Sequence, residues 1–332
     1  MMSRAAPQTR LPETRPKARR DRLILLGLGL LFLLGLYGLS QATDWQSILV
    51  EFTRLNSWQI LILLALSTAN YTLRGLRWHL FVRALPLAIP LSANLVQFLG
   101  GFAMSLTPGR VGELVRLRWL TRDSKAPLDR AAPVMIADRA SDLTALALLL
   151  GAALALNASA MRGAVPVACL ALVTGFAATH PGLLRGLANA AFRASGHRAP
   201  RLFARLRRAA RALSAFTRAG ILLPALAFGL VGWGAEAWSF QLLLHWLGDD
   251  ISLARATAIF IFATLAGGLT GAPGGLGGAE AAMVALLALD GTPLSVAIAA
   301  TALIRVTTLW FAVALGILFF PLAERGTFSR HR

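Results

Sequence analysis

Charged residues are scarce in this chain: they make up 14% of its 332 residues, whereas hydrophobic residues make up 56%. So few charges cannot cover the surface of a water-soluble protein of this length. The mean hydropathy is +0.63, and the apolar residues come in long runs that fit a bilayer. The composition therefore excludes a soluble enzyme and indicates an integral membrane protein built from several helices.

Cysteine and histidine are also rare. Cys169 is the only cysteine, so the chain has no disulfide framework and no thiolate metal site. The five histidines are scattered, and the chain has no zinc-protease, nucleophile-elbow or phosphate-loop motif. We therefore expect no catalytic residue, no metal and no cofactor, so that the protein is not an enzyme.

Acidic residues are few as well, which leaves a net charge of +18. The excess lies between the apolar runs, a distribution that argues against nucleic acid and follows the positive-inside rule. Nine arginines and no acidic residue lie between 185 and 218, so the loop 181–219 is predicted to be cytoplasmic. Residues 1–22 predict a disordered basic cytoplasmic tail and residues 322–332 a second cytoplasmic tail. This charge pattern indicates a cytoplasmic (inner) membrane protein.

The apolar runs predict about six full spans within a single transmembrane domain over 23–321, so the fold class is an all-α polytopic membrane protein. The predicted spans are 23–39, 58–73, 131–156, 164–179, 221–246 and 294–321. Residues 40–42 after the first span leave a cleaved signal peptide open as an alternative. Arg74, Arg77 and Arg83 after the second span, with Trp78 between them, predict an interfacial anchor.

Part of the basic loop repeats apolar residues at helical spacing: Leu202, Leu206, Ala209, Leu213 and Phe216. This pattern predicts an amphipathic helix on anionic headgroups, with a solvated linker as the alternative.

Two further apolar runs, 91–106 and 254–270, are broken by Pro-Gly elements at 107–113 and 271–280. Pro108 and Pro273 lie 165 residues apart, Glu113 and Glu280 lie 167 apart, and Arg139 and Arg305 lie 166 apart. The first hairpin is entered from the inside and the second from the outside. The units 58–156 and 221–320 are therefore predicted to be inverted repeats, each with one re-entrant hairpin.

Breaking a helix inside hydrocarbon leaves backbone groups that protein, water or a ligand must satisfy. Two breaks at matched places predict a shared central polar cavity, where glycines and helix N-termini would suit a phosphate-bearing headgroup. The alternative is that both Pro-Gly elements are kinks that only help helices to pack.

Charged residues inside the spans mark the same region. Asp138 and Asp142 lie one turn apart and need a cation between them, for which Arg139, Arg110 and Arg305 are the candidates. Glu236, Glu280 and Arg305 are the buried charges of the second half, and Arg305 is expected to be free to meet a phosphate. A purely structural ion-pair network, or a metal bridging the two aspartates, stays open as an alternative.

Four motifs resemble the transmembrane (flippase-like) region of lysylphosphatidylglycerol synthases: RGLRW at 74–78, SLTPGRVGE at 105–113, DRASD at 138–142 and PGGLG at 273–277. The resemblance covers residues 23–321 and implies translocation of an anionic or phosphate-bearing lipid. The soluble aminoacyl-transferase domain of the resistance factors in that family is absent from this sequence, so synthesis of the lipid is not implied.

The implied partners are membrane lipids with an anionic headgroup or a polyprenyl phosphate, and possible lipid-biosynthesis enzymes, with no nucleic acid. An integral-membrane transferase, or a scaffold subunit in lipid, hopanoid or polyprenyl-phosphate-sugar biosynthesis, remains the alternative function. The residues that we expect to bind substrate are Arg77, Pro108, Gly109, Arg110, Gly112, Glu113, Asp138, Arg139, Asp142, Pro273, Gly274, Glu280 and Arg305.

Overall fold

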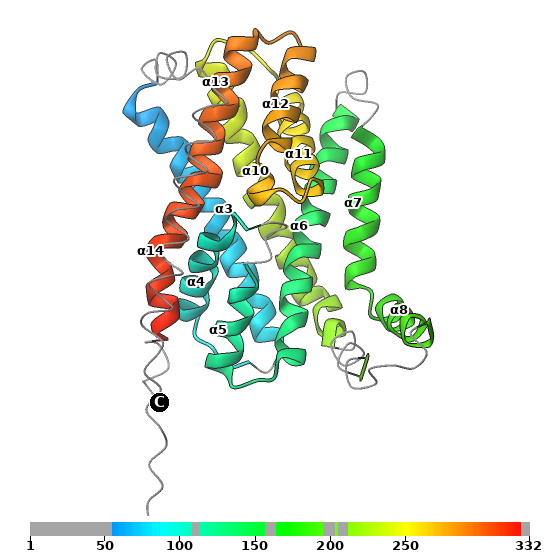
Figure 1. Cartoon of the computed structure of the whole chain (residues 1–332). Coiled ribbons are helices and arrows are strands. Elements are labelled where there is room, and N and C mark those ends of the chain that lie inside the picture. Colours follow the sequence, from blue (N-terminus) through cyan, green and yellow to red (C-terminus); the bar gives the residue numbers. More distant parts are fainter. Residues whose placement is uncertain are drawn as a thin grey trace, which may run out of the picture.

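The structure is a computed structural model and describes residues 55–85, 87–107, 113–156, 164–194, 203–204 and 212–326. Every regular element in these ranges is helical (Figure 1). Among the described residues, three helices are long and apolar enough to cross a membrane: α6 (Leu128–Leu156), α10 (Ala219–Trp246) and the continuous helix Leu294–Arg325. The predicted all-α polytopic fold is confirmed. The predicted tail 1–22, the first span 23–39, the candidate cleavage site and residues 327–332 lie outside the described residues.

Helix α3 (Ser57–Ala84) begins at a capping box, in which the Asn56 side chain accepts from the Gln59 amide and the Gln59 side chain from the Asn56 amide, both at 2.8 Å. The helix continues well past residue 73, so Arg74, Arg77 and Trp78 lie inside it and are buried. The prediction that these residues anchor the helix at the interface is wrong. Carboxylates of α6 meet the two arginine charges inside the bundle.

The two broken hairpins enter the bundle from opposite ends and turn back near its middle (Figure 1). Their helices are too short to span a bilayer. The first hairpin consists of α4 (Leu91–Gly100), η1 (Gly101–Met104) and α5 (Val115–Ser124); the second consists of α11 (Leu253–Leu269), η4 (Pro273–Gly275) and α12 (Gly278–Leu289).

The tips of the two hairpins meet each other. Gly274 has a φ of 63°, which favours glycine and allows the tight turn of η4. A Cβ atom at Gly274 would lie 3.1 Å from Leu106 of the first hairpin and 3.2 Å from Leu309. The tips therefore form an apolar contact at the centre of the molecule.

The two halves of the chain have the same order of elements. A long helix starts at residue 57 or 219, a broken hairpin at 91 or 253, and a second long helix at 128 or 294. In the second half, this last helix consists of α13 (Leu294–Arg305), a π-helical turn η5 (Val306–Trp310) and α14 (Phe311–Arg325). Because α3 and α10 run in opposite directions and pack along each other, the halves have the arrangement of inverted repeats (Figure 1).

Between the halves, α7 (Ala164–Thr179) packs against α6, and α8 (Pro181–Ala194) follows it at the same end of the molecule as the C-terminus of α14 (Figure 1). Part of the predicted basic loop is therefore helical, and Leu187 on α8 is exposed.

The turn η3 (Leu213–Thr217) contradicts one prediction for that loop. Leu213 and Phe216 are buried, and the ring of Phe216 lies 5.2 Å from that of Phe81, so these two residues do not face lipid headgroups. They pack inside because the end of α3 offers an apolar surface. Leu202, Leu206 and Ala209 lie outside the described residues.

At the opposite end, Arg255 and Asp290 join the loops that flank the second hairpin at 2.9 Å. Burial raises the pKa of the Asp290 carboxyl; Arg255 opposes this effect and Asp249 adds to it. The turn after α10 and the turn after α12 therefore lie together, and Thr292 donates to Asp249 Oδ2 at 2.5 Å.

Gly267 is expected to be essential for closing the second hairpin. A Cβ atom there would lie 2.7 Å from Ala279 Cβ and 3.0 Å from its backbone nitrogen, so Gly267→Ala forces α11 and α12 apart. We expect a loss of about 1–3 kcal/mol of stability, as for other overpacked contacts. Thermal unfolding in detergent measures it. The control is Gly268→Ala, whose Cβ atom meets nothing within 4 Å; equal stability of both variants would contradict the prediction.

Candidate functional site

A buried ion-pair network joins α3 and α6. One nitrogen of Arg77, Nη2, donates to Asp138 Oδ1 and to Asp142 Oδ1, both at 2.7 Å. Arg74 Nη2 donates to Asp142 Oδ2 at 2.7 Å, and Arg77 is completely buried. The positive charge that the two aspartates need is therefore supplied mainly by Arg74 and Arg77 of α3. These two arginines were predicted to lie at the membrane interface.

Arg139 completes this network and connects it to the first hairpin. Its Nη2 atom lies 3.0 Å from Asp138 Oδ2 and 3.1 Å from Glu113 Oε2, and its Nη1 atom lies 3.8 Å from Asp142 Oδ2. Of the three arginines predicted as candidates for this cation, Arg139 lies beside both aspartates, Arg305 pairs with Glu280, and Arg110 lies outside the described residues. The Arg139 side chain is 33% exposed, whereas those of Arg74 and Arg77 are 5% and 0% exposed. Arg139 is therefore the accessible cation among these three.

Arg116 was not among the residues predicted from the sequence to bind substrate. Its side chain is fully buried on α5, and its Nη1 atom lies 3.4 Å from Glu113 Oε2. The guanidinium carbon stacks 4.3 Å from the ring centroid of Phe98 and 5.0 Å from that of Phe102. Gly101 leaves room for this side chain, because a Cβ atom there would collide with it. The spacing of three residues from Glu113 was the signal that could have revealed the pair.

In the second half, Arg305 pairs with Glu280. Arg305 Nε lies 2.5 Å from Glu280 Oε1, and Arg305 Nη2 donates to the carbonyl oxygen of Gly274 at 2.9 Å. The expectation that Arg305 is free to meet a phosphate is therefore wrong. Glu280 and Arg305 are the sequence counterparts of Glu113 and Arg139, so each hairpin is tied to the following long helix by an equivalent ion pair.

Some of the remaining predicted residues lie outside the described ranges, and the structure places the others in the second half of the chain. Pro108, Gly109, Arg110 and Gly112 lie outside the described residues. Pro273 and Gly274 form the turn of the second hairpin, and Glu236 is buried on α10.

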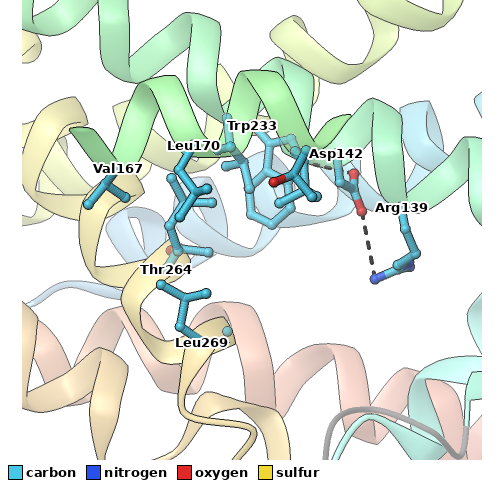
Figure 2. A pocket seen from close by; sticks show the side chains of 13 residues that line it. Arg139, Asp142, Val167, Leu170, Trp233, Thr264 and Leu269 are labelled. Carbon is cyan, nitrogen blue, oxygen red and sulfur yellow. Dashed lines mark hydrogen bonds and ion pairs between the residues drawn. The ribbon is translucent and has the colours of Figure 1, made fainter. Parts of the chain in front are cut away.

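A cavity of about 360 Å³ lies between α6, α7, α10 and α11 (Figure 2). Arg139 and Asp142 form its polar end, and Trp233 donates from Nε1 to Asp142 Oδ1 at 3.1 Å. The other walls are almost entirely apolar: Leu143, Leu146, Val167, Leu170, Ala171, Leu265, Gly268 and Leu269, with Thr174 and Thr264.

This cavity is not the predicted one between the two hairpins. None of its lining residues comes from the described part of the first hairpin, and Arg305 does not line it. It lies beside the second hairpin, whose helix α11 contributes Thr264, Leu265, Gly268 and Leu269.

The aspartates have no carboxylate oxygen left for a bridging metal. Both oxygens of each carboxylate lie beside an arginine. Within the described residues, no group of three or more His, Cys, Asp or Glu side chains could hold a metal ion. The arrangement is suited to binding an anion through Arg139.

Comparison with known proteins identifies membrane proteins that this chain resembles. The family model described as lysylphosphatidylglycerol synthase TM region matches residues 24–316. A UPF0104 membrane protein of Methanothermobacter thermautotrophicus is 27% identical over 288 residues, which cover 79% of this chain and 84% of that protein. A second match of the same description and organism is 30% identical over 109 residues, 33% of this chain and 32% of that protein.

Proposed function

The chain belongs to the family of lysylphosphatidylglycerol synthase transmembrane regions, and from this premise and the geometry of the cavity we propose that it moves a phosphate-bearing lipid between membrane leaflets. The observation that carries the proposal is one accessible arginine, Arg139, at the polar end of an otherwise apolar cavity among membrane helices. The protein would act in the cytoplasmic membrane, with both termini cytoplasmic, as a transporter and not as an enzyme.

The chemistry of the cavity matches the two parts of a lipid. A guanidinium binds phosphate through two parallel hydrogen bonds, and it does so more strongly where water is excluded. The leucine and valine walls suit an acyl or prenyl chain, and a volume of about 360 Å³ is within the range of ligand cavities. Because buried charges in a bilayer are costly, a network of this size is more readily explained by function than by packing alone.

Filling the cavity is expected to stop lipid movement. Gly268 lines the cavity, and a Cβ atom there meets nothing within 4 Å, so Gly268→Trp can place its ring in the space without displacing the backbone. We expect the rate of leaflet transfer to fall more than about tenfold, since the ring occupies volume that the substrate needs. The measurement follows a fluorescent, tail-labelled phosphatidylglycerol in proteoliposomes by dithionite quenching.

The matched control is Gly151→Trp, because Gly151 is also a helical glycine with open space around it but does not line the cavity. Unchanged transfer in Gly268→Trp would contradict the proposal. If the wild type altered the lipid chemically without changing its leaflet, the transferase alternative would replace transport.

A further inference from the structure

Glu113 is shared between two arginines of different accessibility. Its Oε2 atom lies 3.1 Å from Arg139 and 3.4 Å from Arg116, and its Oε1 atom accepts from Ser105 Oγ at 3.0 Å. The Arg139 side chain is 33% exposed and lines the cavity, whereas Arg116 is fully buried. An anion entering the cavity can therefore reach Arg139 but not Arg116.

Arg116 has unused capacity to bind this carboxylate. None of its three guanidinium nitrogens has a hydrogen bond within the described residues. Its neighbours are aromatic rings and, at 3.4 Å, the Glu113 Oε2 atom that also contacts Arg139. A buried donor without a hydrogen bond costs free energy that a closer carboxylate would recover. Glu113 therefore has a second cation available if its contact with Arg139 is lost.

We propose that Arg116 is a positioning residue, which takes over Glu113 when a lipid phosphate displaces that carboxylate from Arg139. The inference rests on the proposed function, since it concerns the same headgroup site. Glu113 lies two residues before the start of α5, and Arg139 lies on α6. The exchange of partners therefore unties the tip of the first hairpin, at residues 105–107, from α6 when the substrate binds.

The equivalent pair in the second half lacks such a partner. Glu280 Oε1 pairs with Arg305, while Glu280 Oε2 is buried and has no hydrogen bond within the described residues. Displacing Arg305 would leave Glu280 as an uncompensated charge, which is costly. The exchange is therefore specific to the first hairpin, and only this hairpin responds to the headgroup.

A double-mutant cycle tests the exchange. The probe is the tail-labelled phosphatidylglycerol, and its dissociation constant is measured by fluorescence anisotropy with the full-length protein in detergent micelles. Glu113→Gln removes the competing carboxylate, so binding becomes about tenfold tighter. Arg116→Met removes the cation that would receive Glu113, so binding becomes about tenfold weaker. The double variant is expected to bind as tightly as Glu113→Gln, because no carboxylate is then left to strand.

The rescue distinguishes positioning from packing. If Arg116 only filled the space among Phe98 and Phe102, the double variant would bind as weakly as Arg116→Met, and the inference would be overturned. The double-mutant cycle measures lipid binding, whereas the proteoliposome assay measures leaflet transfer. A wild-type protein that binds the lipid but does not transfer it refutes the proposed function, and the double-mutant cycle still tests the exchange of partners.

A measurement without lipid tests the same tie. In a Cys169→Ser background, Thr107→Cys at the tip is labelled with a maleimide, and the labelling rate reports how firmly the tip is held. We expect the rate to be highest with Glu113→Gln, intermediate with native residues 113 and 116, and lowest with Arg116→Met, where Glu113 remains bound to Arg139. Labelling of Arg116→Met as fast as the reference, or faster, would overturn the inference even if the probe lipid does not bind.

Discussion

Replacing Arg139 by alanine is expected to abolish leaflet transfer while the protein remains inserted and folded. Asp138 and Asp142 keep Arg77, and Asp142 also keeps Arg74, so the buried carboxylates stay paired. What is lost is the accessible cation at the polar end of the cavity. The charge pair that is lost is the one between Arg139 and the lipid phosphate inside the cavity. Losing one partner of such a desolvated pair costs about 2–5 kcal/mol, which corresponds to a transfer rate at least about thirtyfold lower. Dithionite quenching of tail-labelled phosphatidylglycerol in proteoliposomes measures the rate.

Two further variants define the result. Arg139→Lys is expected to retain partial activity, because an ammonium attracts phosphate but lacks the bidentate fork. Arg255→Ala removes an arginine of similar exposure at the far end of the molecule and is expected to leave transfer unchanged. Wild-type transfer in Arg139→Ala would refute the headgroup site, and a protein that no longer folds would show that the network is mainly structural.

The sequence predicts helix limits well where the chain passes from apolar to charged residues at the membrane surface. The span predicted over 164–179 matches α7, and that predicted over 221–246 begins two residues inside α10. The same reasoning fails for α3, because Arg74 and Arg77 look like the end of a span. Their partner Asp142 lies 68 and 65 residues away in the chain, and local hydropathy carries no information about such a pair.

The candidate site was predictable in part for the same reason. The repeated spacing identified Glu113, Arg139, Glu280 and Arg305 as equivalent positions, but spacing alone does not say which of them touch. The structure pairs them within each half. The cavity beside α7 and α11 was not predicted, because broken helices indicate polar backbone, whereas the position of open space depends on how side chains such as Leu106 and Leu309 pack.

Arg305→Ala is expected to cause a large loss of stability. Arg305 is the only ion-pair partner of Glu280 within the described residues, and the Glu280 side chain is 18% exposed. Removing the cation leaves a mostly buried carboxylate uncompensated and also deprives the Gly274 carbonyl of its donor. A buried pair broken in this way costs about 3–5 kcal/mol. Thermal unfolding of the purified protein in detergent should therefore show a clearly lower midpoint.

The second substitution identifies the cause of this loss. Glu280→Gln in the Arg305→Ala background removes the stranded charge and is expected to recover most of the lost stability, although not the hydrogen bond to Gly274. Arg305→Lys keeps the ion pair with Glu280, but an ammonium lacks the planar guanidinium that binds Glu280 and the Gly274 carbonyl at the same time. Its unfolding midpoint should therefore lie between those of the wild type and Arg305→Ala. If the double variant is no more stable than Arg305→Ala, then Arg305 stabilises the second hairpin through packing and the Gly274 carbonyl, and not through Glu280.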